Sequence, residues 1–414
     1  MSRRAWIRKA ALWVWNYHAT LGGKLLIGGW FLSTLVSAAA MDIPVYRFVC
    51  AWTAPGVVAW LVGMALRPRL QPIAQIPARA TAGETLPIDV RLRNASPRNA
   101  YDVGAGWFGL PAGLSQVKQD EAVSVLAPGA EATITVRLNA LRRGIYRLPI
   151  LRVYSLFPFG FFRIPAGRLR ATRLLVRPAF HPLTALPLPM SNRYQPGGVA
   201  QYTRVGASPE YIGNREYRAG DSPRRLDFRA WARLSRPVVR EFQDEYYCRV
   251  ALVLDTRAPG AQKAPPGGVP AMEAAVALTA ACAEALSRGD YLVDLFAAGP
   301  ELHIFRAGQH QAHLDSILDL LAGIEATRED PFGTVAPALS MELRHIAAVV
   351  FVLLDWDAAR ERLVRTAVEA GCRVKVLVVR DTDTTLSPGS GGPLPGEHTR
   401  LTPGSVLQGG VTSV

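Results

Sequence analysis

The residues with the most chemical potential lie in one stretch, residues 210–245, where arginines and carboxylates are interleaved with aromatic side chains. Neither a buried strand nor a buried helix needs such a mixture, so the stretch has a task beyond filling a core. Three interpretations are open: an internal network of ion pairs, a surface for a protein partner, or a site for nucleic acid or anionic lipid.

The interleaving of opposite charges favours the ion-pair network, because a nucleic-acid face carries few acids among its arginines. Such a network would join three arginines to three carboxylates: Arg224, Arg225 and Arg229 to Glu216, Asp221 and Asp227. Such a network would hold residues 210–245 against the domain that follows them. We therefore expect no nucleic-acid partner, and the protein-partner surface stays open.

The sequence lacks the motifs of two common classes of enzyme. It contains neither a Gly-x-Ser-x-Gly elbow nor a phosphate-binding Gly-x4-Gly-Lys-Ser/Thr loop. His310 and His313 lie three apart, but a third metal ligand of clear spacing is missing, so we interpret them as helix-surface side chains. The sequence therefore predicts a protein that is not an enzyme.

Composition points to several domains and to a membrane segment. The chain has 414 residues, 49% hydrophobic, with a formal net charge of +14. This length predicts two or three domains. The charge suits an anionic surface, an acidic partner or cytoplasmic membrane loops. The four cysteines (Cys50, Cys248, Cys282 and Cys372) form no C-x-x-C pair, which favours a reducing compartment.

Two apolar runs, residues 25–41 and 45–66, follow a basic, aromatic N-terminus. Each nearly meets the roughly 20 residues of helix that a bilayer core requires. A cleaved signal peptide is the rival interpretation of the first run, and the immediate second run argues against it. Because basic residues flank both outer ends, residues 1–70 predict a transmembrane hairpin with both ends in the cytoplasm.

Residues 71–180 predict an antiparallel β-sandwich, because short runs of alternating apolar and polar residues are separated by turn signals. Residues 157–162, Phe-Pro-Phe-Gly-Phe-Phe, predict a tight turn whose aromatics pack on the sandwich edge. A partner-binding aromatic patch is the alternative. Residues 181–247 form a connector that is rich in Pro and Gly at its start and carries the charged stretch.

Residues 248–380 predict a doubly wound α/β domain. Continuous apolar runs that end in Asp255 and Asp355 alternate with helical patterns, as in parallel sheets covered on both faces. Beyond Asp381 the sequence is dominated by Gly, Pro, Ser and Thr, so residues 381–414 predict a disordered tail.

The charged stretch resembles the hallmark of the domain of unknown function 58 family. The resemblance rests on residues 216–228, EYRAGDSPRRLDF, and on residues 232–242, ARLSRPVVREF; residues 142–146 (RRGIY) and 157–160 (FPFG) also look like that family. We assign the motif and interaction role to Glu216, Tyr217, Gly220, Asp221, Arg224, Arg225, Asp227, Arg233, Arg240 and Glu241. The resemblance implies a membrane hairpin, a β-sandwich, the motif and a von Willebrand factor A-like (Rossmann-type) domain.

Von Willebrand A-like domains can hold Mg²⁺ through an Asp-x-Ser-x-Ser loop, a Thr and a further Asp, so the resemblance implies Asp255, Thr334 and Asp355 as ligands. The two serine positions are occupied by Arg257 and Pro259. Arg257 would bring a guanidinium to the place of the cation and neutralise the aspartates. We therefore expect a degenerate site and no cofactor, with weak Mg²⁺ binding as the alternative.

The resemblance also implies a partner. Many members of the family are encoded beside MoxR-type AAA+ ATPases, and some beside transglutaminase-like membrane proteins. We expect a bacterial inner-membrane protein, mostly cytoplasmic, that serves as a scaffold or adaptor for a MoxR-type ATPase in protein maturation or complex assembly. The alternatives are a membrane-tethered, Mg²⁺-dependent ligand-binding domain and a component of a transglutaminase-like system. The client and the oligomeric state stay open.

Overall fold

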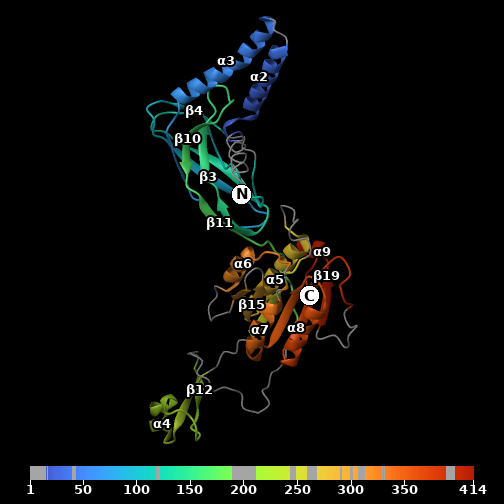
Figure 1. Cartoon of the computed structure of the whole chain (residues 1–414). Helices are drawn as coiled ribbons and strands as arrows, with labels where there is room; N and C mark the ends of the chain where they lie inside the picture. The colour runs from blue at the N-terminus through green and yellow to red at the C-terminus, as the bar shows by residue number, and fades with distance from the viewer. Residues whose placement is uncertain are drawn as a thin grey trace. The chain divides into compact units, whose positions relative to one another are not determined.

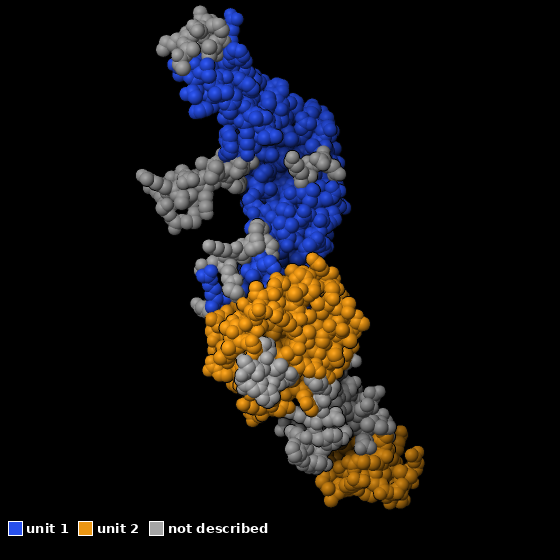
Figure 2. Space-filling model, turned by 90° about the vertical axis from the view of Figure 1, so that its right-hand side faces the viewer, with its two compact units in different colours: residues 1–180, 258–280, 315–328 blue, residues 181–257, 281–314, 329–414 orange. Residues whose placement is uncertain are grey.

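The computed structural model describes residues 15, 17–39, 43–117, 122–188, 211–242, 249–258, 268–289, 291–298, 302–305, 313–328, 330, 332–387 and 397–414. The chain divides into two compact units, which are described separately (Figure 2). Unit 1 comprises residues 1–180, 258–280 and 315–328. Unit 2 comprises residues 181–257, 281–314 and 329–414.

Unit 1 begins with the two helices that hydropathy predicts, α2 (Leu21–Ala39) and α3 (Ile43–Ala65). They pair as an antiparallel hairpin (Figure 1): Trp30 Nε1 donates to Thr53 Oγ1 at 2.9 Å, and a Cβ on Gly29 would lie 2.8 Å from the Trp52 ring. Both are long and apolar enough to cross a membrane, and most of each helix is exposed.

Two four-stranded antiparallel sheets follow, in the orders β1-β3-β7-β5 and β10-β9-β4-β6. Their strands are β1 (Leu70–Ala74), β3 (Thr85–Asn94), β4 (Ala100–Gly106), β5 (Leu114–Gln116), β6 (Val123–Leu126), β7 (Glu131–Ala140), β9 (Leu151–Ser155) and β10 (Ile164–Leu169). Strand β3 alternates strictly between exposed and buried residues. Its inward side chains share one core with residues from both sheets, which confirms the β-structure that the alternation predicts.

A third sheet of unit 1 joins β2 (Arg79–Thr81), β11 (Thr172–Arg177) and β8 (Gly144–Leu148). Strand β8 carries the end of the RRGIY motif. Arg143 of this motif is buried, and its guanidinium donates to the carbonyls of Leu321 (3.1 Å) and Ile324 (2.6 Å) at the C-terminal end of helix α6 (His313–Gly323). The same guanidinium forms an ion pair with Glu273 of helix α5 (Pro270–Arg288). The motif therefore caps a helix whose last carbonyls lack partners of their own.

Unit 2 contains a six-stranded sheet in the order β16-β15-β14-β17-β18-β19. Its strands are β14 (Arg249–Leu254), β15 (Leu292–Ala298), β16 (Leu302–Phe305), β17 (Ala348–Leu353), β18 (Arg373–Val379) and β19 (Glu397–Leu401). All neighbours are parallel except β15 and β16. Numbered along the chain, the strands lie in the order 3-2-1-4-5-6, and the direction of winding reverses between β14 and β17.

Every residue of β17 is buried, so both faces of this sheet are covered. On one face, helices α7 (Phe332–Glu342) and α8 (Ala358–Glu369) pack apolar side chains such as Val335 and Val364 into a core shared with β14, β17 and β18. The helices position the residues that follow β14 and β17, which form the candidate site.

The prediction of a disordered tail is wrong for residues 397–414. Strand β19 extends the parallel sheet beside β18, and helix α9 (Pro403–Leu407) follows it with Thr402 as N-cap. The side chain of Lys375 pairs with Glu397 at 3.1 Å, and the backbone amide of Arg380 donates to the Leu401 carbonyl. A polar edge strand has a composition that resembles a loop, which is why composition misassigned it.

Replacing Arg143 with Ala should lower the free energy of unfolding by about 3–5 kcal/mol, because two helix-end carbonyls would lose their buried donor and Glu273 would keep only its longer ion pair with Arg142. Urea denaturation of the full chain in detergent measures the change. The matched control is Arg147→Ala, an exposed arginine of β8 in the same motif region, for which a change below about 0.5 kcal/mol is expected. Equal effects of the two substitutions would contradict the capping role.

Candidate functional site

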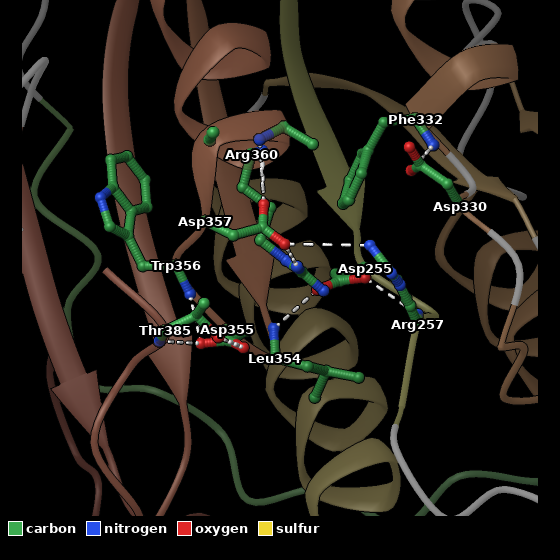
Figure 3. Close-up of polar contacts among 12 residues, drawn as sticks. Asp255, Arg257, Asp330, Phe332, Leu354, Asp355, Trp356, Asp357, Arg360 and Thr385 are labelled. Carbon is green, nitrogen blue, oxygen red and sulfur yellow. Dashed lines mark hydrogen bonds and ion pairs between the residues drawn. The ribbon is translucent and has the colours of Figure 1, made fainter. Parts of the chain in front are cut away.

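Polar side chains gather where β14 and β17 end, which is the position at which open α/β sheets bind their ligands (Figure 3). Asp255 directly follows β14, and Asp355 lies two residues beyond the end of β17. Asp357 and Arg360 belong to the start of α8. The sequence prediction of two aspartates at this edge is therefore matched by the strand register.

Asp255 is completely buried, and both of its carboxylate oxygens accept hydrogen bonds. Oδ1 accepts from the backbone amide of Arg257 at 2.9 Å, and Oδ2 accepts from the backbone amide of Leu354 at 2.9 Å. Oδ2 also receives the Arg360 guanidinium, with Nε at 2.8 Å and Nη2 at 2.7 Å. The carboxylate thereby joins the end of β14 to β17 and to α8.

Arg360 is held in place from several sides. Asp357 is the N-cap of α8 and accepts from the backbone amides of Ala359 (3.1 Å) and Arg360 (3.0 Å), while its other oxygen pairs with the Arg360 guanidinium. The guanidinium also lies over the Phe332 ring, 5.2 Å from its centroid. Only 2% of Arg360 is exposed, so its orientation is determined by these contacts.

The electrostatics follow from burial and pairing. Burial raises the pKa of the Asp255 carboxyl, and the Arg360 charge with the two backbone amides opposes that rise. Burial by itself would lower the pKa of the Arg360 guanidinium, but Asp255 and Asp357 outweigh it, so that pKa is raised and the guanidinium stays charged. The positive charge beside Asp255 is therefore the guanidinium of Arg360.

Asp355 faces a different set of partners. It accepts from the Thr385 backbone amide (2.9 Å) and hydroxyl (2.6 Å), and it pairs with Arg380 at 2.5 Å. Partial burial opposes the shift, but these donors and the Trp356 amide lower the pKa of Asp355. Asp255 and Asp355 therefore lie at one edge of the sheet, each occupied by its own arginine.

The prediction that the Arg257 guanidinium neutralises the aspartates is wrong. Arg257 contacts Asp255 only through its backbone amide, and its guanidinium lies 3.9 Å from Asp357. Arg360 supplies the charge instead. The sequence signal that would have found it is the pair Asp357 and Arg360 directly after a buried strand, where a helix start brings the side chain of its third residue back toward the strand end.

The remaining predicted ligand is Thr334. It lies in the first turn of helix α7 and not in a separate turn before a helix, because α7 begins at Phe332. Its side chain and all of Pro259 and His310 lie outside the described residues, as does the side chain of His313 at the start of α6. Within the described part of the chain, no three His, Cys, Asp or Glu side chains are grouped to hold a metal ion.

The donor set around Asp255 does not fit Mg²⁺. This ion requires near-octahedral oxygen coordination at about 2.0–2.1 Å. Asp255 already uses both oxygens, and Arg360 places a fixed positive charge within hydrogen-bond distance of Oδ2. A cation would have to displace a buried guanidinium to reach the carboxylate.

The charged stretch forms a small module of its own. Strands β12 (Tyr211–Glu216) and β13 (Val238–Phe242) pair as an antiparallel hairpin. Between them lie a 3₁₀ turn (Pro223–Arg225) and helix α4 (Phe228–Leu234). Asp227 caps α4 by accepting from the backbone amides of Arg229 and Ala230, and Gly220 adopts a φ of 108°, which favours glycine.

Ion pairs do run through this module, but the arginines differ from those predicted. Asp221 pairs with Arg215 at 2.7 Å, Asp227 with Arg240 at 3.3 Å, and Glu216 with Arg236. Two hydrogen bonds from Arg215, together with the backbone amide of Arg218, lower the pKa of Asp221 to about 2. Strand pairing brings Arg215, Arg236 and Arg240 to these carboxylates, and the linear spacing of charges does not reveal it.

The predicted partners Arg224 and Arg229 are exposed, as is Arg233, and Arg225 is half-buried. Among the described residues no ion pair joins any of these four to a carboxylate. Apolar side chains lie beside them: Phe228 is 67% exposed and stacks with Trp231, their ring centroids 6.2 Å apart. Tyr217 is also exposed, whereas the side chain of Glu241 lies outside the described residues.

One family model matches part of the chain. Residues 213–391 match the model of a family described as "Protein of unknown function DUF58", which supports the resemblance that the motif predicts. A search of curated proteins gave no match.

Likenesses to solved structures are weak. The secreted serine protease VesC from Vibrio cholerae is 12% identical over 29% of this chain and 25% of its own length, with a TM-score of 0.20. A CARDB domain from Pyrococcus furiosus is 13% identical over 26% of this chain and 94% of its own, with a TM-score of 0.17. The native conformation of E. coli alpha-2-macroglobulin is 14% identical over 73% of this chain and 15% of its own, with a TM-score of 0.20. TM-scores this low carry no argument.

Replacing Arg360 with Ala should lower the free energy of unfolding by about 3–5 kcal/mol, because Asp255 would be left buried and unpaired. The double variant Asp255→Leu/Arg360→Met should recover most of this loss, since a buried pair replaced by apolar residues is often neutral. Chemical denaturation of the full chain in detergent measures both, with exposed Arg362→Ala as the matched control. A single variant as stable as the control would contradict this account.

Proposed function

We propose that this chain is a membrane-anchored adaptor without enzymatic activity, acting with a MoxR-type AAA+ ATPase in protein maturation or complex assembly. In this proposal α2 and α3 cross the bacterial cytoplasmic membrane and the rest of the chain lies on the cytoplasmic side. The match of residues 213–391 to the family model and the layout that the family implies support the proposal.

The observation that carries the proposal is the Asp255–Arg360 pair. The edge of the sheet where open α/β folds place their chemistry is filled by side chains that satisfy one another. A general base or nucleophile needs a free lone pair directed toward a substrate. The carboxylates of Asp255 and Asp355 direct theirs at guanidinium and amide groups, which favours a structural role for this edge.

The strand order supports a von Willebrand A-like assignment for the six-stranded sheet. Such a domain is wound as 3-2-1-4-5-6 with an antiparallel strand at one edge, and here β16 is that strand. We infer a variant of this fold in which the magnesium position is replaced by the Arg360 guanidinium. A magnesium-dependent ligand-binding role therefore has less support than binding through protein surfaces.

Membrane anchoring is supported by the two exposed apolar helices and by their flanking charge. Leu32 and Trp60 on the outer faces of α2 and α3 are more than half exposed, a state that suits lipid better than water. Arg67 and Arg69 follow α3 directly and are exposed. Basic residues at this position favour the cytoplasmic side of a membrane.

The partner surface that we assign lies on the module formed by β12, α4 and β13. It combines exposed aromatics with arginines that lack an ion-pair partner among the described residues, a combination enriched at protein interfaces. The chain has no phosphate-binding loop, so a partner ATPase would supply the hydrolysis. A partner surface that is acidic and also carries apolar side chains would complement the arginines and aromatics of this module.

Exchanging Arg224 and Arg225 for Glu should abolish recovery of the ATPase in a pull-down from detergent extract while circular dichroism stays unchanged. The matched control is Arg170→Glu/Arg173→Glu, which makes the same charge change at exposed positions of the sandwich. The control should recover the ATPase as the unaltered chain does.

Each outcome of this experiment has a distinct meaning. Loss of folding in the Arg224/Arg225 variant would contradict a docking surface and favour an internal clamp. Unchanged recovery would place the docking surface elsewhere on the chain. Failure of the unaltered chain to recover any AAA+ ATPase would overturn the proposed function.

A further inference from the structure

The aromatic turn of residues 157–162 connects β9 to β10 at the end of the sandwich nearest the helical hairpin. Phe157 packs against Tyr101 within the sandwich, with ring centroids 4.9 Å apart, as predicted for a turn on its edge. Phe159 is different because 53% of it is exposed. The function of an exposed phenylalanine at this place is not explained by the sandwich core.

The turn contacts the start of α2. The Thr20 hydroxyl donates to the Gly160 carbonyl at 2.6 Å, and the Thr20 amide donates to the Phe161 carbonyl at 3.1 Å. A Cβ on Gly23 would lie 2.1 Å from the Phe161 carbonyl oxygen, so the first turn of α2 fits against the aromatic turn only with glycine there.

The same turn and the strand after it contact the end of α3. A Cβ on Gly63 would lie 2.8 Å from Ile164 Cγ1 and 3.2 Å from the Phe157 carbonyl oxygen. Beyond the helix, Arg67 Nε donates to the Pro165 carbonyl at 2.6 Å. The turn is therefore fixed to both helices at once, through backbone atoms and glycines that allow close approach.

These contacts determine the depth of the turn relative to a bilayer. Because α2 and α3 are antiparallel, Leu21 and Ala65 lie at the same end of the hairpin. Gly23 and Gly63 each lie two residues inside that end, a distance of about 3 Å along a helix. If the helices cross a membrane, the turn lies at the level where both leave the hydrocarbon.

The chemistry around the turn suits that level. Phe159 packs on Phe161 at 5.9 Å between ring centroids, and Trp15 is 40% exposed just before α2. Exposed Arg67 and Arg69 follow α3. Aromatic rings are enriched at membrane–water interfaces, and arginines nearby bind anionic headgroups.

We propose that residues 157–162 form an interfacial membrane anchor, in which Phe159 inserts among the lipid headgroups and Arg67 and Arg69 contact anionic lipid. The inference rests on the proposed membrane anchoring by α2 and α3 and adds a third contact from the sandwich itself. Three contacts hold the sandwich in one orientation at the membrane surface, whereas a hairpin on a flexible linker would leave it free to turn.

A fluorescent label tests this in the full chain reconstituted into vesicles of phosphatidylcholine and phosphatidylglycerol. An environment-sensitive fluorophore is attached to Phe159→Cys in a background with Cys50→Ser and Cys248→Ser. Cys282 and Cys372 are buried, and burial raises the pKa of the Cys282 thiol to about 12, so neither competes for the label. Lipids carrying a nitroxide either near the headgroup (shallow) or near the middle of an acyl chain (deep) act as quenchers.

Two further label positions make the result interpretable. Leu32→Cys reports on α2 itself, where the native side chain is 61% exposed. Leu141→Cys lies just past β7, at the opposite end of the sandwich, about 30 Å from the strand end nearest the hairpin at 3.3 Å per residue. Leu141 is 50% exposed, which is comparable to Phe159.

We expect nitroxide lipid to reduce emission at positions 159 and 32, with the shallow nitroxide more effective at 159, and to leave emission at position 141 unchanged. Quenching at position 32 but not at 159 would overturn the interfacial anchor and leave the transmembrane hairpin intact. Absence of quenching at position 32 would overturn the membrane anchoring itself. Equal quenching at 159 and 141 would overturn a defined orientation.

Discussion

The buried ion pair between Asp255 and Arg360 is the interaction on which the α/β unit depends. It fixes the end of β14 to α8, and through the Leu354 amide it fixes both to β17. Two charges removed from water stabilise a fold only when their remaining hydrogen-bonding groups are satisfied. Here the backbone amides of Arg257 and Leu354 and the carboxylate of Asp357 complete the set. Removing one partner of the pair would therefore lower the free energy of unfolding by much more than the intact pair contributes to it.

The same use of arginine recurs in unit 1. Arg143 caps helix α6 and pairs with Glu273, and Arg163 donates to the carbonyls of Tyr17 and Ala19 before α2. Each guanidinium joins segments that are far apart in the sequence, for which a planar group with five donors is suited. Part of the basic character of the chain is thus structural. The net charge by itself is therefore not evidence for a nucleic-acid partner.

Strands could be predicted from the sequence where the hydropathy of successive residues follows a regular pattern. The alternation in β3 and the continuous apolar run of β17 assign strands directly, because side-chain burial follows the period of the strand. Strand β19 was missed because its residues, Glu-His-Thr-Arg-Leu, carry no such period. Its place at the edge of the sheet comes from pairing with β18, which is a tertiary contact.

The site was predictable only in part for the same reason. Asp255 and Asp355 are recognised because each follows a buried strand, and parallel strands end at one edge. The sequence signals one of their arginine partners, Arg360, only through the helix start after β17. The other, Arg380, lies in the segment after β18, where spacing gives no signal. In the module of residues 211–242 the carboxylates were chosen correctly, whereas Arg215, Arg236 and Arg240 reach them through hairpin pairing. Nearest neighbours in sequence were the wrong partners.

The Arg360 guanidinium occupies the face of Asp255 that a metal ion would need, and we therefore infer that this edge of the six-stranded sheet binds no Mg²⁺. Calorimetric titration of Mg²⁺ into the full chain in detergent tests it most directly. This account predicts no saturable heat, because Arg360 occupies the coordinating face of Asp255. Saturable binding with micromolar affinity would contradict it and would restore the metal-dependent interpretation of the site.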